Sequence, residues 1–78
     1  MFLNKNRRRD IAEAIAAIEN ARRDVESIRD DEQDCLDNMP ENLEDSDRCA
    51  KMEAAIDNLD DAIDSLEDAI NSLDKASE

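Results

Sequence analysis

The most informative chemical group in this chain is an arginine that interrupts an apolar pattern. Apolar residues recur at intervals of three and four, the period of one helix face: Ile11, Ile15, Ile18, Val25 and Ile28. Arg22 occupies the slot between Ile18 and Val25 where another apolar residue is expected. A charge on such a stripe must pair with a carboxylate or bind an anion.

Two interpretations of Arg22 follow. In the first, Arg22 lies at the rim of the stripe and pairs with Glu19, Glu26 or an acidic residue of another helix. In the second, Arg22, Arg23 and Arg29 from several subunits converge on an anionic ligand, because guanidinium forks match phosphate oxygens. Further polar residues occur around the single proline, and as a cluster they could contact a nucleotide edge or simply cap helices: Asn38, Asn42, Ser46 and Arg48.

A second candidate site is acidic. Six carboxylates recur along the outside of the last third of the chain: Asp57, Asp60, Asp61, Asp64, Glu67 and Asp68. They form either a solvated face that keeps an oligomer soluble or a mimic of nucleic acid, with carboxylates in the place of phosphates. Asp outnumbers Glu although Asp is the poorer helix former, which favours mimicry. The seven-residue spacing, about 10 Å along a helix, is wider than the phosphate spacing and argues against it.

Catalysis has little support in the composition. The chain contains no His and no Gly, so the usual acid–base group, phosphate-binding glycine loops and glycine-dependent calcium loops are all missing. We therefore expect no enzymatic activity, no cofactor and no specific metal site. Cys35 and Cys49 are expected near each other at one end of the fold, as buried free thiols or, less favoured in a cytoplasmic protein, as a disulfide.

Charge is distributed unevenly over the 78 residues. The net charge is −13, with +2 on residues 1–29, −8 on residues 30–50 and −7 on residues 51–78. This balance disfavours direct DNA binding and adsorption to an anionic membrane. Because no apolar run approaches the length of a membrane span or of a signal-peptide core, we expect a cytoplasmic protein without membrane contact.

The second half of the chain is built on a seven-residue repeat. It begins at Ala55-Ile56-Asp57-Asn58-Leu59 and recurs from Ala62 and from Ala69. Ile and Leu occupy the two core positions of a coiled-coil heptad, and Ala precedes each Ile. These alanines favour a second helix lying close on that side.

The elements follow from these patterns. We expect an all-α fold consisting of a basic N-terminal arm, 1–6, and one helical-hairpin domain, 7–78. Within this domain we predict a helix over 7–36, a turn over 37–45 and a helix over 46–77. Pro40 prevents one continuous helix because it lacks an amide hydrogen.

Folding the chain about residue 42 predicts an antiparallel, coiled-coil-like register. It places Cys35 opposite Cys49, Ile28 opposite Ile56, Val25 opposite Leu59, Ile18 opposite Leu66 and Ile11 opposite Leu73. A two-helix hairpin leaves large apolar side chains half exposed. We therefore predict a homodimer or higher homo-oligomer that forms a helical bundle.

The turn also suggests a context. Asn38-Met39-Pro40-Glu41-Asn42-Leu43, with the acidic residues before it and the heptads after it, resembles small proteins of bacteriophages and prophages. The resemblance implies a non-catalytic protein in the cytoplasm of a bacterial host that acts against host defence by binding one of its components.

Our first hypothesis is sequestration of an anionic nucleotide signal by an oligomer. It assigns ligand binding to arginines and turn residues: Arg22, Arg23, Arg29, Asn38, Asn42 and Arg48. The alternatives are an acidic inhibitor of a host defence nuclease, which would act in the manner of an anti-CRISPR protein, and a structural coiled-coil adaptor.

Overall fold

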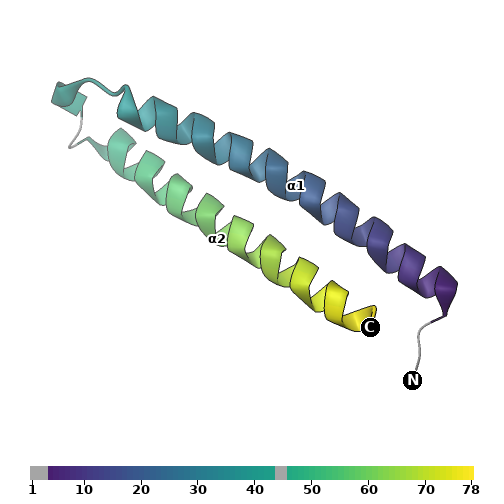
Figure 1. The fold of residues 1–78 in the computed structure, drawn as a ribbon. Coiled ribbons are helices and arrows are strands. Elements are labelled where there is room, and N and C mark those ends of the chain that lie inside the picture. Colours follow the sequence, from purple (N-terminus) through teal and green to yellow (C-terminus); the bar gives the residue numbers. More distant parts are fainter. Residues whose placement is uncertain (1–3, 44–45) are drawn as a thin grey trace.

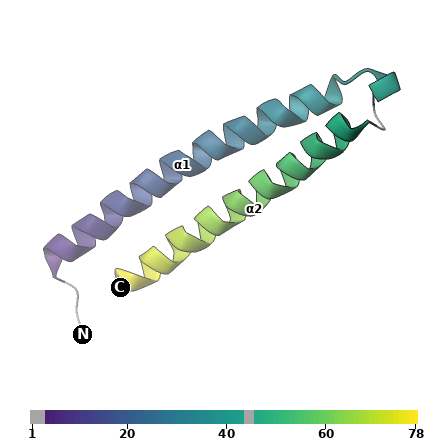
Figure 2. The same ribbon diagram turned by 180° about the vertical axis from the view of Figure 1, so that it is seen from behind.

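The protein is a hairpin of two long helices that lie side by side along their whole length. The computed structural model describes residues 4–43 and 46–78. Helix α1 spans Lys5–Asp37, a short 3-10 helix η1 spans Glu41–Leu43, and helix α2 spans Asp47–Ala76. Figures 1 and 2 show α1 and α2 antiparallel, with the start of α1 and the end of α2 at the open end and η1 at the closed end. The Cα extents are 60 × 16 × 12 Å, so the molecule is a thin rod.

Helix α1 begins earlier than the sequence pattern predicts. Asn4 caps it, since the Asn4 Oδ1 atom accepts a hydrogen bond from the backbone N–H of Arg7 at 2.8 Å. Lys5 and Asn6, expected in the N-terminal arm, are therefore the first helical residues, and residues 1–3 of that arm lie outside the described part. At the other end the Asp34 carbonyl oxygen accepts two hydrogen bonds from Asn38, one from its backbone N–H and one from its side-chain amide.

Helix α2 begins after a second cap. The Ser46 hydroxyl accepts the Cys49 backbone N–H at 3.2 Å, which satisfies one of the free amides of the first turn. The helix bounds therefore agree with the predicted ranges within one or two residues. Pro40 lies directly before η1, in the segment that separates the two α-helices.

The core face of α2 is the row of heptad core positions that the sequence predicts. We call this row, and the row on α1 that packs against it, the seam. Cys49 and Ile56 are buried, at 5% and 6% exposure, and half-buried residues continue the seam: Met52, Leu59, Ile63, Leu66, Ile70 and Leu73. The alanines that precede the seam isoleucines, Ala55, Ala62 and Ala69, are also half-buried. The three- and four-residue spacing thus holds over the whole helix.

The seam of α1 differs from the prediction in its second half. The half-buried residues of α1 that follow the three- and four-residue spacing are Ile11, Ile15, Ile18, Arg22, Val25, Arg29, Glu32 and Leu36, and Glu19 and Gln33 beside them are also half-buried. Ile28, expected in the core, is 55% exposed, and Arg29 lies on the seam in its place. The regular alternation of four and three residues continues from Val25 to Arg29, whereas Ile28 comes one residue too early.

The register also differs from the predicted one. Arg22 pairs with Glu67 and Arg29 pairs with Asp60, and both pairs of residue numbers add up to 89 rather than about 84. Consequently Arg29, not Ile28, meets the middle of α2, and the pairing of Ile28 with Ile56 is wrong. Leu36 lies beside Ile56 in a shallow hollow instead.

The resulting core is thin. Cys49 and Ile56 are the only buried residues in the part of the chain that the structure describes, and no side chain there is fully enclosed. None of the described helices is both long and apolar enough to cross a membrane.

Candidate functional site

Two ion pairs join the helices along one edge of the hairpin. The Arg29 Nε–H donates to Asp60 Oδ1 at 2.9 Å, and the Arg22 Nη1 atom lies 3.9 Å from Glu67 Oε1. We call these two contacts the clamp pairs. In each helix the two members are seven residues apart, so both pairs occupy equivalent positions one heptad apart.

The clamp pair of Arg29 is the tighter one. The hydrogen bond to Asp60, with the charge of that carboxylate, raises the pKa of Arg29 above its usual value, and Asp30 adds a smaller contribution. The Asp30 carboxylate lies 3.5 Å from the Arg29 Nη1 atom. The positive charge of Arg29 is therefore balanced by one carboxylate on each helix, and the guanidinium stays protonated throughout the physiological pH range.

Arg22 is less completely satisfied. Its Nε atom lies 3.4 Å from Glu26 Oε1 on the same helix, yet this buried Nε atom has no hydrogen bond. The guanidinium thus sits between two carboxylates, Glu26 and Glu67, as the rim interpretation of Arg22 anticipates. Its third predicted partner, Glu19, makes no ion pair with it in the described structure.

The other predicted anion-binding residues lie elsewhere. Arg23 points away from the seam and donates to Asn20 Oδ1 at 3.3 Å, so it does not join Arg22 and Arg29. Asn42 is exposed in η1, and Ser46 caps α2. Arg48 is at the closed end, seven to eight turns of helix away from the open end. The predicted constellation is therefore split into the clamp pairs, one outward arginine and a separate group at the turn.

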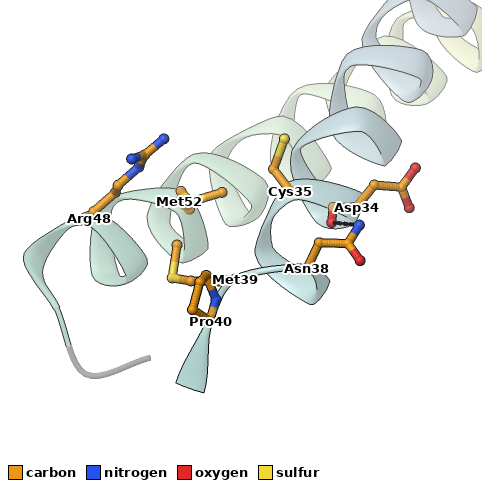
Figure 3. A pocket seen from close by; sticks show the side chains of 7 residues that line it. All are labelled: Asp34, Cys35, Asn38, Met39, Pro40, Arg48 and Met52. Atoms are coloured by element: carbon orange, nitrogen blue, oxygen red, sulfur yellow. Dashed lines mark hydrogen bonds between the residues drawn. The ribbon is translucent and has the colours of Figure 1, made fainter. Parts of the chain in front are cut away.

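That group at the turn surrounds a pocket of about 380 Å³, the closed-end pocket. Its lining comes from the end of α1, the turn and the start of α2: Asp34, Cys35, Asn38, Met39, Pro40, Arg48 and Met52. Figure 3 shows these side chains around one hollow, with Arg48 on the α2 side and Asp34 on the α1 side. Asn38 and Arg48 therefore line the same pocket from different helix ends, together with the sulfur-containing and apolar residues Cys35, Met39, Pro40 and Met52.

The cysteines have the predicted environment only in part. Both are free thiols, but only Cys49 is buried, whereas Cys35 is exposed beside the closed-end pocket. The Cys49 Sγ atom lies 3.6 Å from Glu53 Oε1. Because the α1 seam continues through Arg29 rather than Ile28, Leu36 takes the inward position that was expected for Cys35.

The acidic face separates into two groups. Asp60 and Glu67 belong to the clamp pairs, whereas Asp57, Asp61, Asp64 and Asp68 are exposed and make no ion pair with any described residue. These four carboxylates, which we call the free acidic row, therefore remain available to solvent or to a basic partner.

Over most of its length, the edge opposite the clamp pairs has a column of uncharged residues on each helix, with the exposed Asp24 and Asp31 beside the α1 column. It is formed by the residues that immediately precede the seam positions of each helix: Ala14, Ala21, Ile28 and Cys35 on α1, and Ala55, Ala62, Ala69 and Ala76 on α2. We call it the apolar flank. Cys35 from one of its columns borders the closed-end pocket together with Arg48, the residue one heptad before Ala55, which places both columns on the same side of the hairpin. The alanines of the α2 repeat indicated that a helix could pack on this side. The α1 column was not recognised from the sequence, because Ile28 was assigned to the core.

No family model, curated protein or solved structure matches this chain. Among the described residues there is also no group of three or more Cys, Asp or Glu side chains arranged to hold a metal ion.

Proposed function

We propose that this chain is a non-catalytic assembly module that works as one half of a helical bundle, with a second copy packed on its apolar flank. The observation that carries this proposal is the flank itself. A column of uncharged residues runs along each helix, and the α1 column contains the large apolar residue Ile28, which is 55% exposed. Isolated exposed apolar residues are ordinary, but a contiguous row at heptad spacing is typical of a helix interface.

The accessible surface supports the same proposal. The chain exposes 5983 Å², whereas a compact folded monomer of 8.8 kDa is expected to expose about 4,800 Å². The excess is roughly 1,200 Å². Stable protein interfaces remove about 600–1,000 Å² from each partner, so one such interface would bring the exposed area close to that of a compact protein.

The width of the apolar stripe on α2 points in the same direction. Seam residues and flank residues together cover three of every seven positions, which is the pattern of a helix that contacts two neighbours rather than one. Alanine at the flank positions lets another helix approach closely. In a hairpin alone, each helix has one neighbour and the flank is left without a partner.

Sedimentation velocity over a range of concentrations tests this function. We expect the wild-type protein to be at least dimeric at micromolar concentration. Ile28→Glu should shift it to monomer because a carboxylate would be buried in the interface. Ser27→Glu adds the same charge one residue away on the outward face and should leave the assembly intact.

The outcomes separate clearly. A wild-type protein that is monomeric at all concentrations would refute the proposal. If both variants associate like the wild type, another surface makes the contact. Circular dichroism of each variant confirms that the helices are retained.

Nucleotide sequestration receives less support from the geometry than assembly does. Arg22 and Arg29 are each held by two carboxylates, so an anion would have to displace Glu67 and Asp60 to reach them. The counter-defence role that the phage resemblance implies does not depend on this ligand. It is equally compatible with a protein target.

The free acidic row favours such a protein target as a second candidate function. Its four carboxylates are exposed and lie on α2 away from the apolar flank, so they would stay accessible in the assembled protein. A basic defence protein is the expected partner, with binding that weakens as salt rises. Replacing the row by asparagine should abolish inhibition of such a protein, while neutralising Asp10, Glu13, Glu19 and Asp24 on α1 removes as much charge and serves as the control.

A further inference from the structure

We infer that the two copies pack antiparallel, with the acidic closed end of each hairpin over the basic open end of the other. The inference rests on the proposed function, since it specifies the orientation of the second copy on the apolar flank. A two-fold axis would cross the flank near its centre. In this arrangement α1 faces α1 of the second copy and α2 faces α2.

Charge complementarity distinguishes this orientation from the parallel one. The open end carries four exposed cations at the start of α1, Lys5, Arg7, Arg8 and Arg9, and none of them forms an ion pair with a described residue. Residues 30–50 at the closed end carry a net charge of −8. A parallel dimer would stack two such ends on each other, whereas an antiparallel dimer brings each one to the cations of the other copy.

The two columns of the flank share a common centre. The column from Ala14 to Cys35 is centred between residues 24 and 25, and the column from Ala55 to Ala76 is centred between residues 65 and 66. The ion pairs place residues whose numbers add up to 89 at the same level, so these centres coincide within one residue. A single two-fold axis can therefore relate both columns to their copies.

Side-chain sizes are complementary about that centre. On α1 the axis brings Ile28 opposite Ala21 of the second copy and Cys35 opposite Ala14 of the second copy. On α2 it brings alanine opposite alanine. The only large side chain of the flank thus meets a small one, as close packing of helices requires.

The closed-end pocket also fits this arrangement. Its lining residues Cys35 and Arg48 lie where the two columns reach the turn. Continuing the α1 column by one heptad from Ala14 leads to Arg7, which would lie over the turn of the second copy near Glu41. The first two turns of α1 in one copy would therefore cover the pocket of the other.

Disulfide trapping tests the orientation. In Ala14→Cys the new thiol would face the native, exposed Cys35 of the second copy, so oxidation with diamide should give a covalent dimer on a non-reducing gel. Glu13→Cys places the thiol on the outward face and is the matched control. Adding Cys35→Ser to Ala14→Cys should abolish the product, because two copies of residue 14 would lie about 32 Å apart along the rod.

Each result has one meaning. A covalent dimer from Ala14→Cys at a yield at least ten-fold above the control supports the antiparallel orientation. If sedimentation shows a dimer but Ala14→Cys does not cross-link, the orientation is refuted and the assembly function survives. A covalent dimer from Ala55→Cys in its place would indicate the parallel form, in which Cys35 faces that residue. A protein that sediments as a monomer refutes the function and the inference together.

Discussion

Arg29 of α1 and Asp60 of α2 form the shortest ion pair in the described structure, with the Nε and Oδ1 atoms 2.9 Å apart. This contact lies on the seam, in a slot where a coiled coil normally places an apolar residue. Arg22 repeats the arrangement one heptad earlier with Glu67. The hairpin therefore combines an apolar seam in α2 with three charged seam positions in α1, Arg22, Arg29 and Glu32, and the ion pairs of the two arginines show which register the helices adopt.

The first prediction concerns the strength of the two clamp pairs. In a double-mutant cycle to alanine, the Arg22–Glu67 pair should show a coupling free energy of about 0.2–1 kcal/mol, because it is long and partly exposed. The Arg29–Asp60 pair should show a larger coupling, since it is hydrogen-bonded. Urea unfolding of the single and double variants measures both. A cycle of Arg23 with Asp60 is the control and should show no coupling.

The second prediction concerns Arg22 itself. Replacing Arg22 by Leu should raise the melting temperature by several degrees, because a buried Nε atom without a hydrogen bond is exchanged for an apolar side chain at a seam position. Thermal unfolding followed by circular dichroism checks this. Arg23→Leu on the outward face should leave the melting temperature nearly unchanged. A lower melting temperature for Arg22→Leu would show that the Glu26 and Glu67 contacts outweigh the cost of burial.

The third prediction concerns the two thiols. At low protein concentration, where the proposed interface is not formed, Cys35 should react rapidly with a thiol reagent, whereas Cys49 should react only as fast as the hairpin opens. The measurement is a stoichiometric titration that follows absorbance over time. Raising the protein concentration should slow Cys35 as well, because the second copy would cover it. Equal fast rates for both thiols would contradict the burial of Cys49.

The fourth prediction concerns the helix caps. Ser46→Ala should lower the free energy of unfolding by about 1 kcal/mol, because the Cys49 amide loses its acceptor. Asn4→Ala removes the equivalent contact from α1, where the end of the helix can fray without opening the seam, so its effect should be smaller. Denaturant titrations of both variants compare the two caps. An equal loss in both would mean that the open end is as tightly packed as the closed end.

The fifth prediction compares two isoleucines, Ile56 in the core between α1 and α2 and Ile28 on the apolar flank. Ile56→Ala should reduce the free energy of unfolding by about 2–5 kcal/mol at any protein concentration, because Ile56 is in the core. Ile28→Ala should have little effect at low concentration and should weaken association at high concentration. Unfolding at two concentrations separates these effects. A concentration-independent loss for Ile28→Ala would place that residue in the fold of the single hairpin.

The elements of this fold could be predicted from the sequence because their signals are local. The heptads of α2, the alanines of α1 and Pro40 fix two helices and a turn within two residues of the observed bounds. The register could not be predicted in the same way. α1 offers two overlapping stripes that share Ile18 and Val25, one continuing through Ile28 and the other through Arg29.

Apolarity alone selects the stripe with Ile28, and this choice was wrong. The structure selects the stripe with Arg29 because Asp60 and Glu67 meet the two guanidinium groups, and those carboxylates lie more than 30 residues away along the chain. The same distant contacts decided the candidate site. The contacts with Asp60 and Glu67 pair Arg22 and Arg29 with α2. Arg23 lies outside the seam, and Cys35 is on the surface rather than in the core.

The repeat in α2 has a consequence for how the chain folds. Sliding α2 along α1 by seven residues presents the same Ile and Leu spacing, and one of the two arginines still meets either Asp60 or Glu67. The helices therefore recognise their alignment only weakly, and misaligned hairpins are expected as transient species that must separate before they can correct. The connection of nine residues from Asn38 to Ser46 spans at most about 30 Å, so it allows a slip of one heptad, about 10 Å, and excludes only larger slips. Chains with a longer turn should reach the native alignment more slowly, even where the final stability is unchanged.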